Sequence, residues 1–570
     1  MFFLYFTFTE QVKSILSDAI EKAEFEAGEI SLEPSQHADL SSRIAFLIGS
    51  RTKQNPKEVA DRIVAEISIP ADSLVGKVEA TGPYINFSAS DAYIQKTYWS
   101  IRTERENFGG NFASGKILLE HTSANPNGPL HVGHIRNSIL GDTLSRILKR
   151  AGYDVEVQYY VNDMGRQIAI VSWAFDHFEF DKTKKGDHAI AEIYIKANRA
   201  LEEDPSKVAE IDRFMQLVES GDEDTIKRFD EAVNYALEGI KKTLLEMNVH
   251  HDSFVTESSF IRSGAVKDIV ERIKATGRTE LDDGAIVVDL SDYGFEKSLV
   301  IQRSDGTSLY TTRDLAYHEW KARHADRVID IFGADHKLIS GQLRATLNAI
   351  GVKEPEVVIF EFVSLPEGSM STRQGKFISA DELLEQVEAR ALEEVTIRRP
   401  EMDDSFKKEV ARMVGIGAVR YDIVKVSPEK STVFDWKEAL DFEKQGAPFI
   451  QYSHARACSI LKKAEEEGLW DPEAQANPAL LVDDSEIAFI KKMALFDQVL
   501  EKCASELKPH HLAIYGRELA DAFNQFYRFS PVLAAEDDNI RAARLGLVDC
   551  ARVVIANVLD TLGIDAPQSM

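Results

Sequence analysis

Residues 116–161 constrain the fold more than any other part of the chain. The segment "KILLEHTSAN" opens with a short apolar run, which is typical of a buried strand. In "DVEVQYYVND" the apolar residues alternate and predict a second strand with one face formed by Val155, Val157, Tyr159 and Val161. Between the two runs, helical spacing is kept by Ile135, Ile139, Leu140, Leu144, Ile147 and Leu148. Gly152 is placed to end that helix, so the segment predicts a βαβ unit of a parallel sheet.

Three or four domains are expected, because 570 residues exceed what one hydrophobic core holds, and the pattern along the chain divides it into three. Residues 1–110 should form an α+β domain, with helices first and a strand and turn at "KVEATGPYINFSAS". Residues 111–445 should form a doubly wound parallel α/β domain of Rossmann type, interrupted by an acidic, largely helical insertion at about 170–290. We expect its sheet to resume with "SLVIQRSDG", "DRVIDIFGADH" and "EVVIFEFVSL". The sequence pattern of residues 446–570 is helical throughout and predicts an all-α domain.

Local signals refine this plan at two places. The apolar start "MFFLYFTF" is too short to span a membrane and has no basic flank, so we expect a buried strand or the lead-in to a helix. Ser379 and Glu382 have the spacing of a capping box and predict the start of a helix.

Composition narrows the function classes. The three cysteines, Cys458, Cys503 and Cys550, form no CxxC pair, so a disulfide framework and a thiolate zinc site are not expected. A reducing cytoplasm fits this usage, and no run approaches a membrane span. The net charge of −27 argues mildly against a nucleic-acid partner, which needs local cations. Only specific motifs outweigh that charge.

His131 and His134, in "NPNGPLHVGHIRN", allow three interpretations. They could be a metal pair, but no third ligand stands nearby in the sequence. They could be two hydrogen-bonded histidines at a helix start. The third interpretation is phosphate binding, because the loop leaves the carboxyl end of a strand and opens a helix whose free N–H groups favour an anion. Gly128 and Gly133 would let a ligand approach the backbone closely.

The motif and its neighbours resemble one family. "HVGH" is similar to the HIGH signature of class I aminoacyl-tRNA synthetases. In order along the chain, "EHTSANPNGPLHVGHIRN", "YYVNDMGRQ", "SDGTSLYTTRDLAYH", "GADH" and "LGIDAPQSM" resemble the arginyl-tRNA synthetase family. The resemblance implies an enzyme that activates L-arginine with ATP to arginyl-adenylate, releases pyrophosphate, and moves arginine to the 3′ end of tRNA(Arg), releasing AMP. It also implies Mg²⁺, a cytoplasmic monomer, and an anticodon-binding role for the C-terminal helices.

Site residues follow from the same resemblance. His131 and His134 would contact the ATP phosphates, and Gly133 would leave room for adenosine. The residues that would hold the substrate arginine are Asn86, Glu120, Asn125, Tyr310 and Asp314. A guanidinium is a planar fork of donors that prefers carboxylates, which agrees with two acids in this set. Glu120 follows an apolar strand, and a lone buried acid there would be costly without a cationic ligand.

A second signature is expected in the loop 368–376. "GSMSTRQGKF" resembles the KMSKS-type loop that closes over the triphosphate, but Ser369 and Thr372 stand at the two positions where the pattern has its lysines. We therefore expect Arg373, with Lys376, to supply the cation, and the alternative is a solvated basic turn. Met370 and Ser371 complete the ATP-binding set of this loop.

Further candidates rest on weaker signals. Asp335 and His336 in "GADH" would line the wall near adenosine. Asp163 and Gln167 in "NDMGRQ" could line the site or cap the next helix. Candidate RNA contacts in the C-terminal helices are Tyr452 and Tyr527, since aromatic rings stack on splayed bases, although each ring could instead belong to the core. Arg456 is a candidate RNA contact through the phosphates. Arg420 is a candidate phosphate contact. Two alternatives stay open: a class I synthetase for another amino acid, and a non-catalytic tRNA-binding paralogue.

Overall fold

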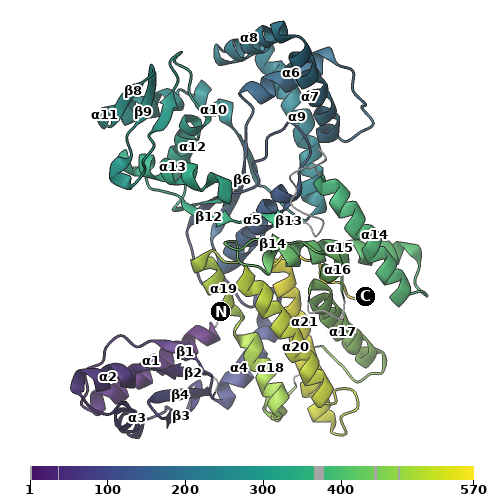
Figure 1. The fold of residues 1–570 in the computed structure, drawn as a ribbon. Coiled ribbons are helices and arrows are strands. Elements are labelled where there is room, and N and C mark those ends of the chain that lie inside the picture. Colours follow the sequence, from purple (N-terminus) through teal and green to yellow (C-terminus); the bar gives the residue numbers. More distant parts are fainter. Residues whose placement is uncertain (1–2, 36, 365–377, 442–445, 473–475) are drawn as a thin grey trace.

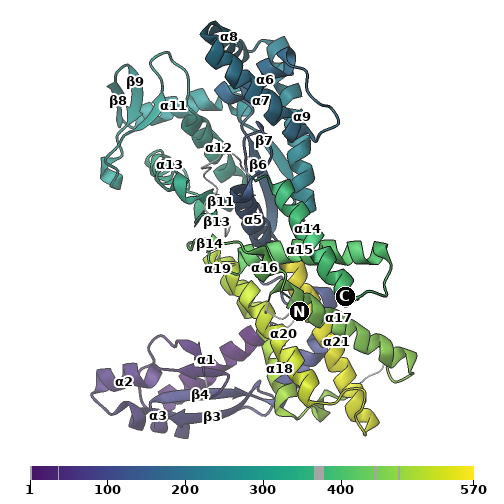
Figure 2. The same cartoon turned by 45° about the vertical axis from the view of Figure 1, so that its right-hand side comes forward.

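The computed structural model describes residues 3–35, 37–364, 378–441, 446–472 and 476–570. The molecule is elongated, with the N-terminal domain and the C-terminal helices at one end and the inserted helices at the other (Figures 1 and 2). The parallel sheet lies between these two ends. None of the helices in the described residues combines the length and the apolar character that crossing a membrane requires.

The N-terminal domain places helices beside a four-stranded antiparallel sheet of order β1-β2-β4-β3. Its elements are α1 (Leu4–Lys22), β1 (Leu32–Pro34), β2 (Leu40–Ser42), α2 (Ile44–Thr52), α3 (Pro56–Ala65), β3 (Val75–Thr81), β4 (Tyr84–Ala89), α4 (Asp91–Glu104) and η1 (Arg105–Asn107). The apolar start of the chain forms the first turns of α1 rather than a strand. Leu4, Phe8, Val12 and Leu16 recur every four residues and are buried along one face of that helix.

The central sheet has five parallel strands in the order β12-β11-β5-β6-β7. They are β5 (Lys116–Glu120), β6 (Asp154–Val161), β7 (Ser253–Thr256), β11 (Arg327–Gly333) and β12 (Glu356–Phe360). Helix α5 (Val132–Ala151) connects β5 to β6 and ends at Gly152, whose φ of 112° is left-handed. The βαβ prediction and the doubly wound fold are confirmed. The strand order reverses between β5 and β11, which is where ligands bind in open sheets of this kind.

Two details of the sheet differ from the sequence expectations. β7 lies inside the segment expected as a largely helical insertion, yet it extends the parallel sheet beside β6. Its four residues, "SFVT", are partly exposed and too short for an apolar signal. The run "SLVIQRSDG" does not resume the parallel sheet: β10 (Leu299–Gln302) pairs antiparallel with β9 (Ala285–Val288) in a separate three-stranded sheet. Its burial alternates, as expected for a strand covered on one face only.

The inserted segments form two groups. The first is a helical bundle of α6 (Arg166–His177), α7 (Gly186–Glu203), η2 (Pro205–Lys207), α8 (Val208–Glu219) and α9 (Glu223–Glu246). The second surrounds the small antiparallel sheet and contains α10 (Glu257–Arg262), α11 (Ala265–Ala275), β8 (Thr279–Asp282), β9 (Ala285–Val288), η3 (Ser291–Tyr293), α12 (Tyr310–His324), η4 (Ala334–His336) and α13 (Lys337–Ala349). In Figure 1 the two groups stand apart above the central sheet.

The remainder of the chain is mainly helical. Its elements are β13 (Val363–Ser364), α14 (Ala380–Arg398), α15 (Asp404–Val424), β14 (Thr432–Val433), α16 (Trp436–Ala439), α17 (Ala447–Glu466), η5 (Pro478–Leu480), α18 (Asp484–Ala494), α19 (Phe496–Glu506), α20 (His510–Phe529) and α21 (Asp538–Thr561). Ser379 and Glu382 form the predicted capping box at the start of α14. The helical prediction for the C-terminal domain is confirmed.

Candidate active site

A strained turn follows β5 at the switch point of the sheet. Thr122 and Ser123 both have left-handed backbone conformations, with φ of 69° and 43°. Such a conformation costs non-glycine residues of order 1–3 kcal/mol each and persists where the surrounding contacts enforce it. Here the Thr122 N–H donates to the side chain of Asn137 at 2.8 Å. The turn directs the Ser123 side chain back toward Glu120, and the Ser123 hydroxyl donates a hydrogen bond to the Glu120 carboxylate at 2.9 Å.

A cavity of about 360 Å³ opens beside this turn. Its lining includes five residues that the sequence analysis proposed: Glu120, Asn125, Tyr310, Asp314 and His336. The other lining residues are Ser123, Tyr160, Asn162, Glu257, Phe332, Ile339 and Ser340. The volume suits a small ligand. Three carboxylates face it, which makes the cavity suited to a cation.

Glu120 is buried at the end of β5, but it is not a lone acid as the sequence suggested. Its Oε2 accepts a hydrogen bond from the Lys321 ammonium at 2.8 Å, and its Oε1 accepts from Ser123. Burial raises the pKa of Glu120, and the Lys321 ammonium opposes that rise. The sequence analysis missed Lys321 because it lies seven residues beyond Asp314, past the end of the motif. Helical spacing from Tyr310 was the signal that could have found it.

Glu257 is a third carboxylate of the cavity that the sequence analysis missed. It begins α10, directly after β7, and is buried. Arg313 lies 3.0 Å from its Oε1. Burial raises the pKa of Glu257 to about 7, although the Arg313 guanidinium opposes the rise. Its strand was too short to recognise in the sequence, so nothing there marked Glu257 as a residue at a strand end.

His131 and His134 lie together at the start of α5. His131 is the N-cap residue, and its Nδ1 accepts from the Gly133 N–H at 3.1 Å. The His134 Nδ1 accepts from the His131 N–H at 3.3 Å. The two rings stack with centroids 3.7 Å apart. Burial lowers the pKa of His131, and burial with the neighbouring His131 lowers that of His134 to about 3. Both rings are therefore neutral, and their use of Nδ1 as an acceptor leaves the proton on Nε2.

The residues after the histidines anchor the helix, a role the sequence analysis missed. Arg136 is completely buried and donates to the main-chain carbonyls of Glu361 at 2.6 Å and Lys430 at 2.9 Å. Asn137 donates to the carbonyl of Ile331 at 3.1 Å. These contacts tie α5 to the ends of neighbouring strands. They fix the position of the HVGH segment relative to the cavity.

The weaker candidates separate into two groups. His336 lines the cavity, and the Asp335 carboxylate lies 3.2 Å from its Nδ1. The Gln167 side chain accepts from Asn125 at 3.0 Å and so supports a cavity residue. Asp163 instead accepts from the Ser258 N–H at 2.8 Å and from its hydroxyl, so it caps α10 and does not line the cavity.

Some proposed residues are not brought to the cavity or lie outside the described residues. Asn86 is buried in β4 of the N-terminal domain, where its Oδ1 accepts from Ser35 at 2.9 Å. Both ribbon views place β4 well away from the central sheet (Figures 1 and 2). In the second signature, Ser369, Met370, Ser371, Thr372, Arg373 and Lys376 all lie outside the described residues.

The C-terminal candidates lie on two helices. Tyr452 on α17 is exposed, and Arg456 lies one turn further along the same helix. The Arg456 guanidinium lies over the Tyr527 ring of α20, 4.3 Å from its centroid, so these two residues form one surface. The phosphate-contact hypothesis for Arg420 is wrong, because that side chain is completely buried and ion-paired with Asp142 at 2.6 Å.

Two charged clusters among the described residues have the composition of a metal site. Two clusters offer three suitable ligand atoms, namely Glu120, His318 and Asp330, and Asp187, His188 and Asp381. In each cluster a lysine ammonium already contacts the carboxylates: Lys321 lies 2.6 Å from Asp330, and Lys185 lies 2.5 Å from Asp381. An ammonium at that position repels a second cation, so neither cluster suits a resident metal ion.

Comparison with known proteins identifies the family of the chain. Residues 107–436 match the model "tRNA synthetases class I (R), catalytic domain", residues 450–570 match "DALR anticodon binding domain", and residues 10–89 match "Arginyl tRNA synthetase N terminal domain". The chain is 70% identical over 567 residues to the arginine–tRNA ligase of Methanococcoides burtonii, covering 100% of both chains. It is 69% identical to that of Methanosarcina acetivorans, covering 98% of this chain and 99% of the relative.

A solved structure supports membership of the same family. The Thermus thermophilus arginyl-tRNA synthetase superposes with a TM-score of 0.83 at 28% identity, over 98% of this chain and 100% of that one. The likeness covers nearly the whole chain, so it is not confined to the central sheet. The resemblance read from the HVGH segment and its flanks is confirmed, and the chain belongs to the arginyl-tRNA synthetase family.

Proposed function

We propose that this chain condenses L-arginine with ATP to give arginyl-adenylate and pyrophosphate, and then transfers arginine to the 3′ end of tRNA(Arg) with release of AMP. One observation carries the proposal: Glu120 and Asp314, with Asn125 and Tyr310, line a single cavity beside the turn that leads from β5 to the HVGH segment. The carboxylates match the charge of a guanidinium, and the neighbouring helix start suits a polyphosphate. Their adjacency suits a reaction that joins the two substrates.

The arginine end of the reaction uses fixed acceptors. One oxygen of Glu120 is held by Ser123 and the other by Lys321, yet a carboxylate has about four acceptor positions, so capacity remains for the substrate. Asp314 approaches from α12, on the same helix as Tyr310. Acceptors that are already oriented lose little freedom when arginine binds.

The ATP end uses neutral donors. His131 and His134 would present Nε2–H to the phosphate oxygens as negative charge develops, and Gly133 leaves the helix start open to the nucleotide. Arg373 and Lys376 of the second signature would supply the positive charge. Asp335, beside His336, would face adenosine. Mg²⁺ would enter bound to the ATP phosphates, as is usual for that ion, and needs no dedicated protein cage.

The RNA end of the reaction would use the C-terminal helices. Tyr452, Arg456 and Tyr527 offer one exposed ring, one guanidinium and a second ring on neighbouring helices, a combination that suits unstacked bases. Because one chain supplies every lining residue of the cavity, a monomer would suffice. Its two buried, unpaired cysteines and one partly buried cysteine fit a reducing cytoplasm.

The test is ATP–pyrophosphate exchange with each amino acid in turn, in the presence of tRNA, followed by charging of total tRNA. Arginine should support exchange and charging, whereas Glu120→Gln and Asp314→Asn should each raise the arginine KM at least tenfold. Glu319→Gln is the matched control, because Glu319 is a buried carboxylate on the same helix that pairs with Arg323 rather than facing the cavity.

Three results would contradict the proposal. Charging of a different amino acid would indicate a class I synthetase of other specificity. No exchange with any amino acid, from a protein that still binds tRNA, would indicate the non-catalytic paralogue. An unchanged arginine KM in both carboxylate variants would remove this cavity from arginine binding.

A further inference from the structure

A row of alternating charges lies beneath the candidate arginine cavity. On α12, Tyr310, Asp314, His318 and Lys321 follow one another at intervals of four, four and three residues, so they share one face of the helix. Tyr310 and Asp314 line the cavity, whereas His318 and Lys321 are buried. The helix therefore continues from the cavity wall into the floor below it.

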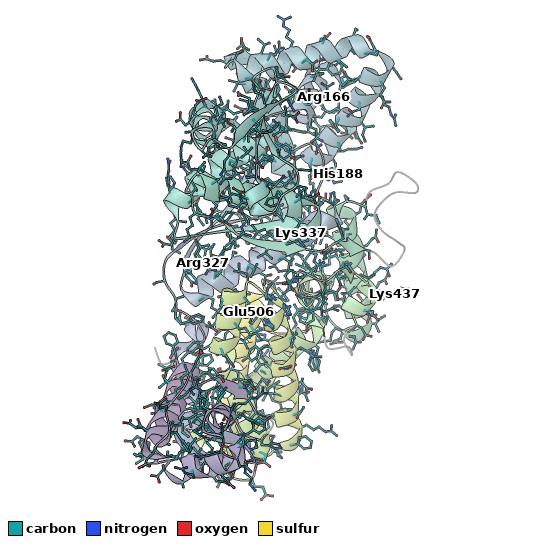
Figure 3. All side chains as sticks on the ribbon, turned by 60° about the vertical axis from the view of Figure 1, so that its left-hand side comes forward. Arg166, His188, Arg327, Lys337, Lys437 and Glu506 are labelled. Carbon is teal, nitrogen blue, oxygen red and sulfur yellow. The ribbon has the colours of Figure 1, made fainter. Side chains whose placement is uncertain are left out.

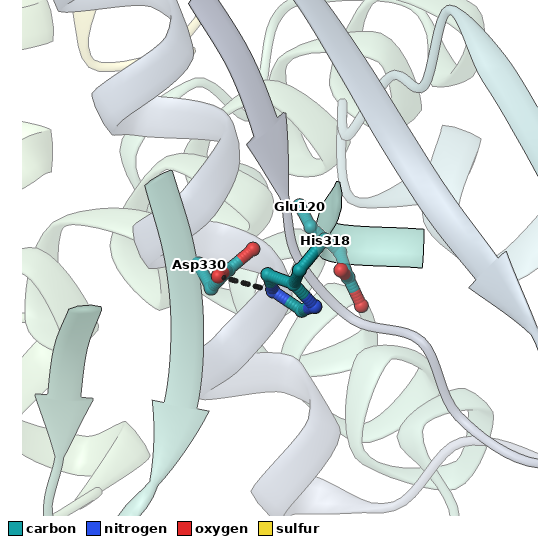
Figure 4. Close-up of side chains that lie close together, drawn as sticks. All are labelled: Glu120, His318 and Asp330. Atoms are coloured by element: carbon teal, nitrogen blue, oxygen red, sulfur yellow. Dashed lines mark hydrogen bonds and ion pairs between the residues drawn. The ribbon is translucent and has the colours of Figure 1, made fainter. Parts of the chain in front are cut away.

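Each charge in this row contacts the next. The Asp314 Oδ1 lies 3.0 Å from His318 Nδ1, and His318 Nε2 lies 2.8 Å from Asp330 Oδ2. The Lys321 ammonium bridges Asp330 Oδ1 at 2.6 Å and Glu120 Oε2 at 2.8 Å. Figure 4 shows His318 joined to Asp330, with Glu120 on the other side of the imidazole. The two carboxylates assigned to arginine are thus the two ends of one continuous chain of contacts.

The sheet makes a buried cation necessary at this point. Glu120 on β5 and Asp330 on β11 are register partners in adjacent parallel strands. Two like charges side by side in a buried sheet repel each other strongly. Lys321 lies between them and also over the Tyr317 ring, 4.2 Å from its centroid. Without the ammonium, one of the two acids would have to take up a proton.

The net charge of these buried groups suits a ligand with one positive charge. Burial and Lys321 oppose protonation of His318, but Asp330 and Asp314 raise its pKa to about 10, so the imidazole is charged near neutral pH. The row consists of Asp314, His318, Asp330, Lys321 and Glu120. With its three carboxyl groups ionised beside the two cations, it carries one net negative charge. A guanidinium brings one positive charge and would leave the buried group neutral, whereas an uncharged side chain would not.

We propose that Lys321, Asp330 and His318 are positioning residues that give the site its preference for a cationic amino-acid side chain. Lys321 fixes one oxygen of Glu120, and His318 fixes one oxygen of Asp314. Asp330 holds the two cations in place from the neighbouring strand. This inference rests on the proposed role of Glu120 and Asp314 in arginine binding.

Lys321→Met in the full-length chain tests the inference. We expect the arginine KM to rise at least tenfold while the ATP KM changes less than twofold. Citrulline, in which a neutral urea replaces the guanidinium, provides the second readout: its inhibition constant divided by the arginine KM should fall at least tenfold in the variant. A merely structural role would move both substrates together.

Arg420→Met is the matched control. Arg420 is also a completely buried cation held by a carboxylate, Asp142, but it does not line the cavity. Its arginine KM should stay within twofold of the unmodified chain. His318→Gln is the second variant, because it removes the other cation and leaves the Lys321 contacts to Glu120 and Asp330 in place; its arginine KM should rise at least threefold.

The outcomes separate two failures. An arginine KM within twofold in Lys321→Met, or equal rises for arginine and ATP, overturns the inference. If Lys321→Met does not fold, an unchanged arginine KM in His318→Gln overturns it instead. If Glu120→Gln and Asp314→Asn also leave the arginine KM unchanged, the proposed arginine site fails; if those two lose arginine while Lys321→Met does not, only the positioning role fails.

Discussion

Arg420→Met should destabilise the chain without changing its affinity for tRNA. Arg420 lies on α15 and is completely buried, with Nη2 2.6 Å from the Asp142 carboxylate. Its other nitrogens donate to the main-chain carbonyls of Leu562 at 2.9 Å, Met247 at 2.9 Å and Asn248 at 3.0 Å. A single guanidinium therefore connects α5, the end of α9, α15 and the end of α21.

The size of the loss follows from what remains after the substitution. Removing one partner of a buried ion pair costs about 3–5 kcal/mol, because the other charge is left uncompensated. Arg146 still donates to the Asp142 carboxylate at 2.7 Å, so Asp142 keeps one cationic partner. Methionine also fills much of the arginine volume. We therefore expect the free energy of unfolding to fall by the lower end of that range, about 3 kcal/mol.

Equilibrium urea denaturation followed by circular dichroism measures the change, and filter binding of tRNA to the folded variant measures the affinity. The affinity should stay within twofold, because a guanidinium surrounded by protein cannot reach a phosphate. A loss of stability below about 1 kcal/mol would refute the energetic argument. A fully stable variant with weakened tRNA binding would show that Arg420 reaches the RNA after all.

Three further predictions test other parts of the structure. Gly546→Ala would place a Cβ 1.7 Å from the hydroxyl of Tyr98 and should destabilise the chain by about 1–3 kcal/mol, measured as a lower Tm, whereas Gly415→Ala, with its nearest neighbour at 3.4 Å, should not. His134→Ala should slow arginyl-adenylate formation roughly 10²–10³-fold, and a loss below threefold would exclude the phosphate-donor role. The hydrogen bond from His188 to a carboxylate of α14 raises the pKa of this histidine, so its stabilising contribution is present at pH 6 and is lost as the pH rises through the folded pKa. His188→Ala should therefore lower the Tm by more at pH 6 than at pH 9.

His188 also shows how the inserted helices are attached to the rest of the catalytic domain. In the view of Figure 3 it lies between Arg166 of the inserted helices and Lys337 near the central sheet. Its carboxylate partner, Asp381, also accepts from Lys185 and Thr243. Asp381 lies one residue after Ala380, whose N–H donates to the carbonyl of Leu130 at 2.7 Å, next to the HVGH segment. The insertion is thus linked to the nucleotide end of the site through the start of α14.

The sequence by itself determined the centre of the fold. Strand, helix and strand around the HVGH segment follow from hydrophobic periodicity and from Gly152, which are local properties. Tyr310 and Asp314 could be named because they belong to a contiguous motif, and the cavity brings them together with Glu120 and Asn125. Where a signal was short, as for the four-residue β7, the sequence did not reveal the strand, because four partly polar residues carry too little periodicity.

The tertiary structure alone decided how the charges are arranged. Nothing local in the sequence indicates that Glu120 and Asp330, 210 residues apart, are neighbours in register across two parallel strands. For the same reason the sequence could not show that Lys321 neutralises them, or that Arg420 is enclosed by four helices instead of facing RNA. A local pattern fixes which face of a helix or strand a side chain occupies, but the partner it meets there is set by how distant segments pack.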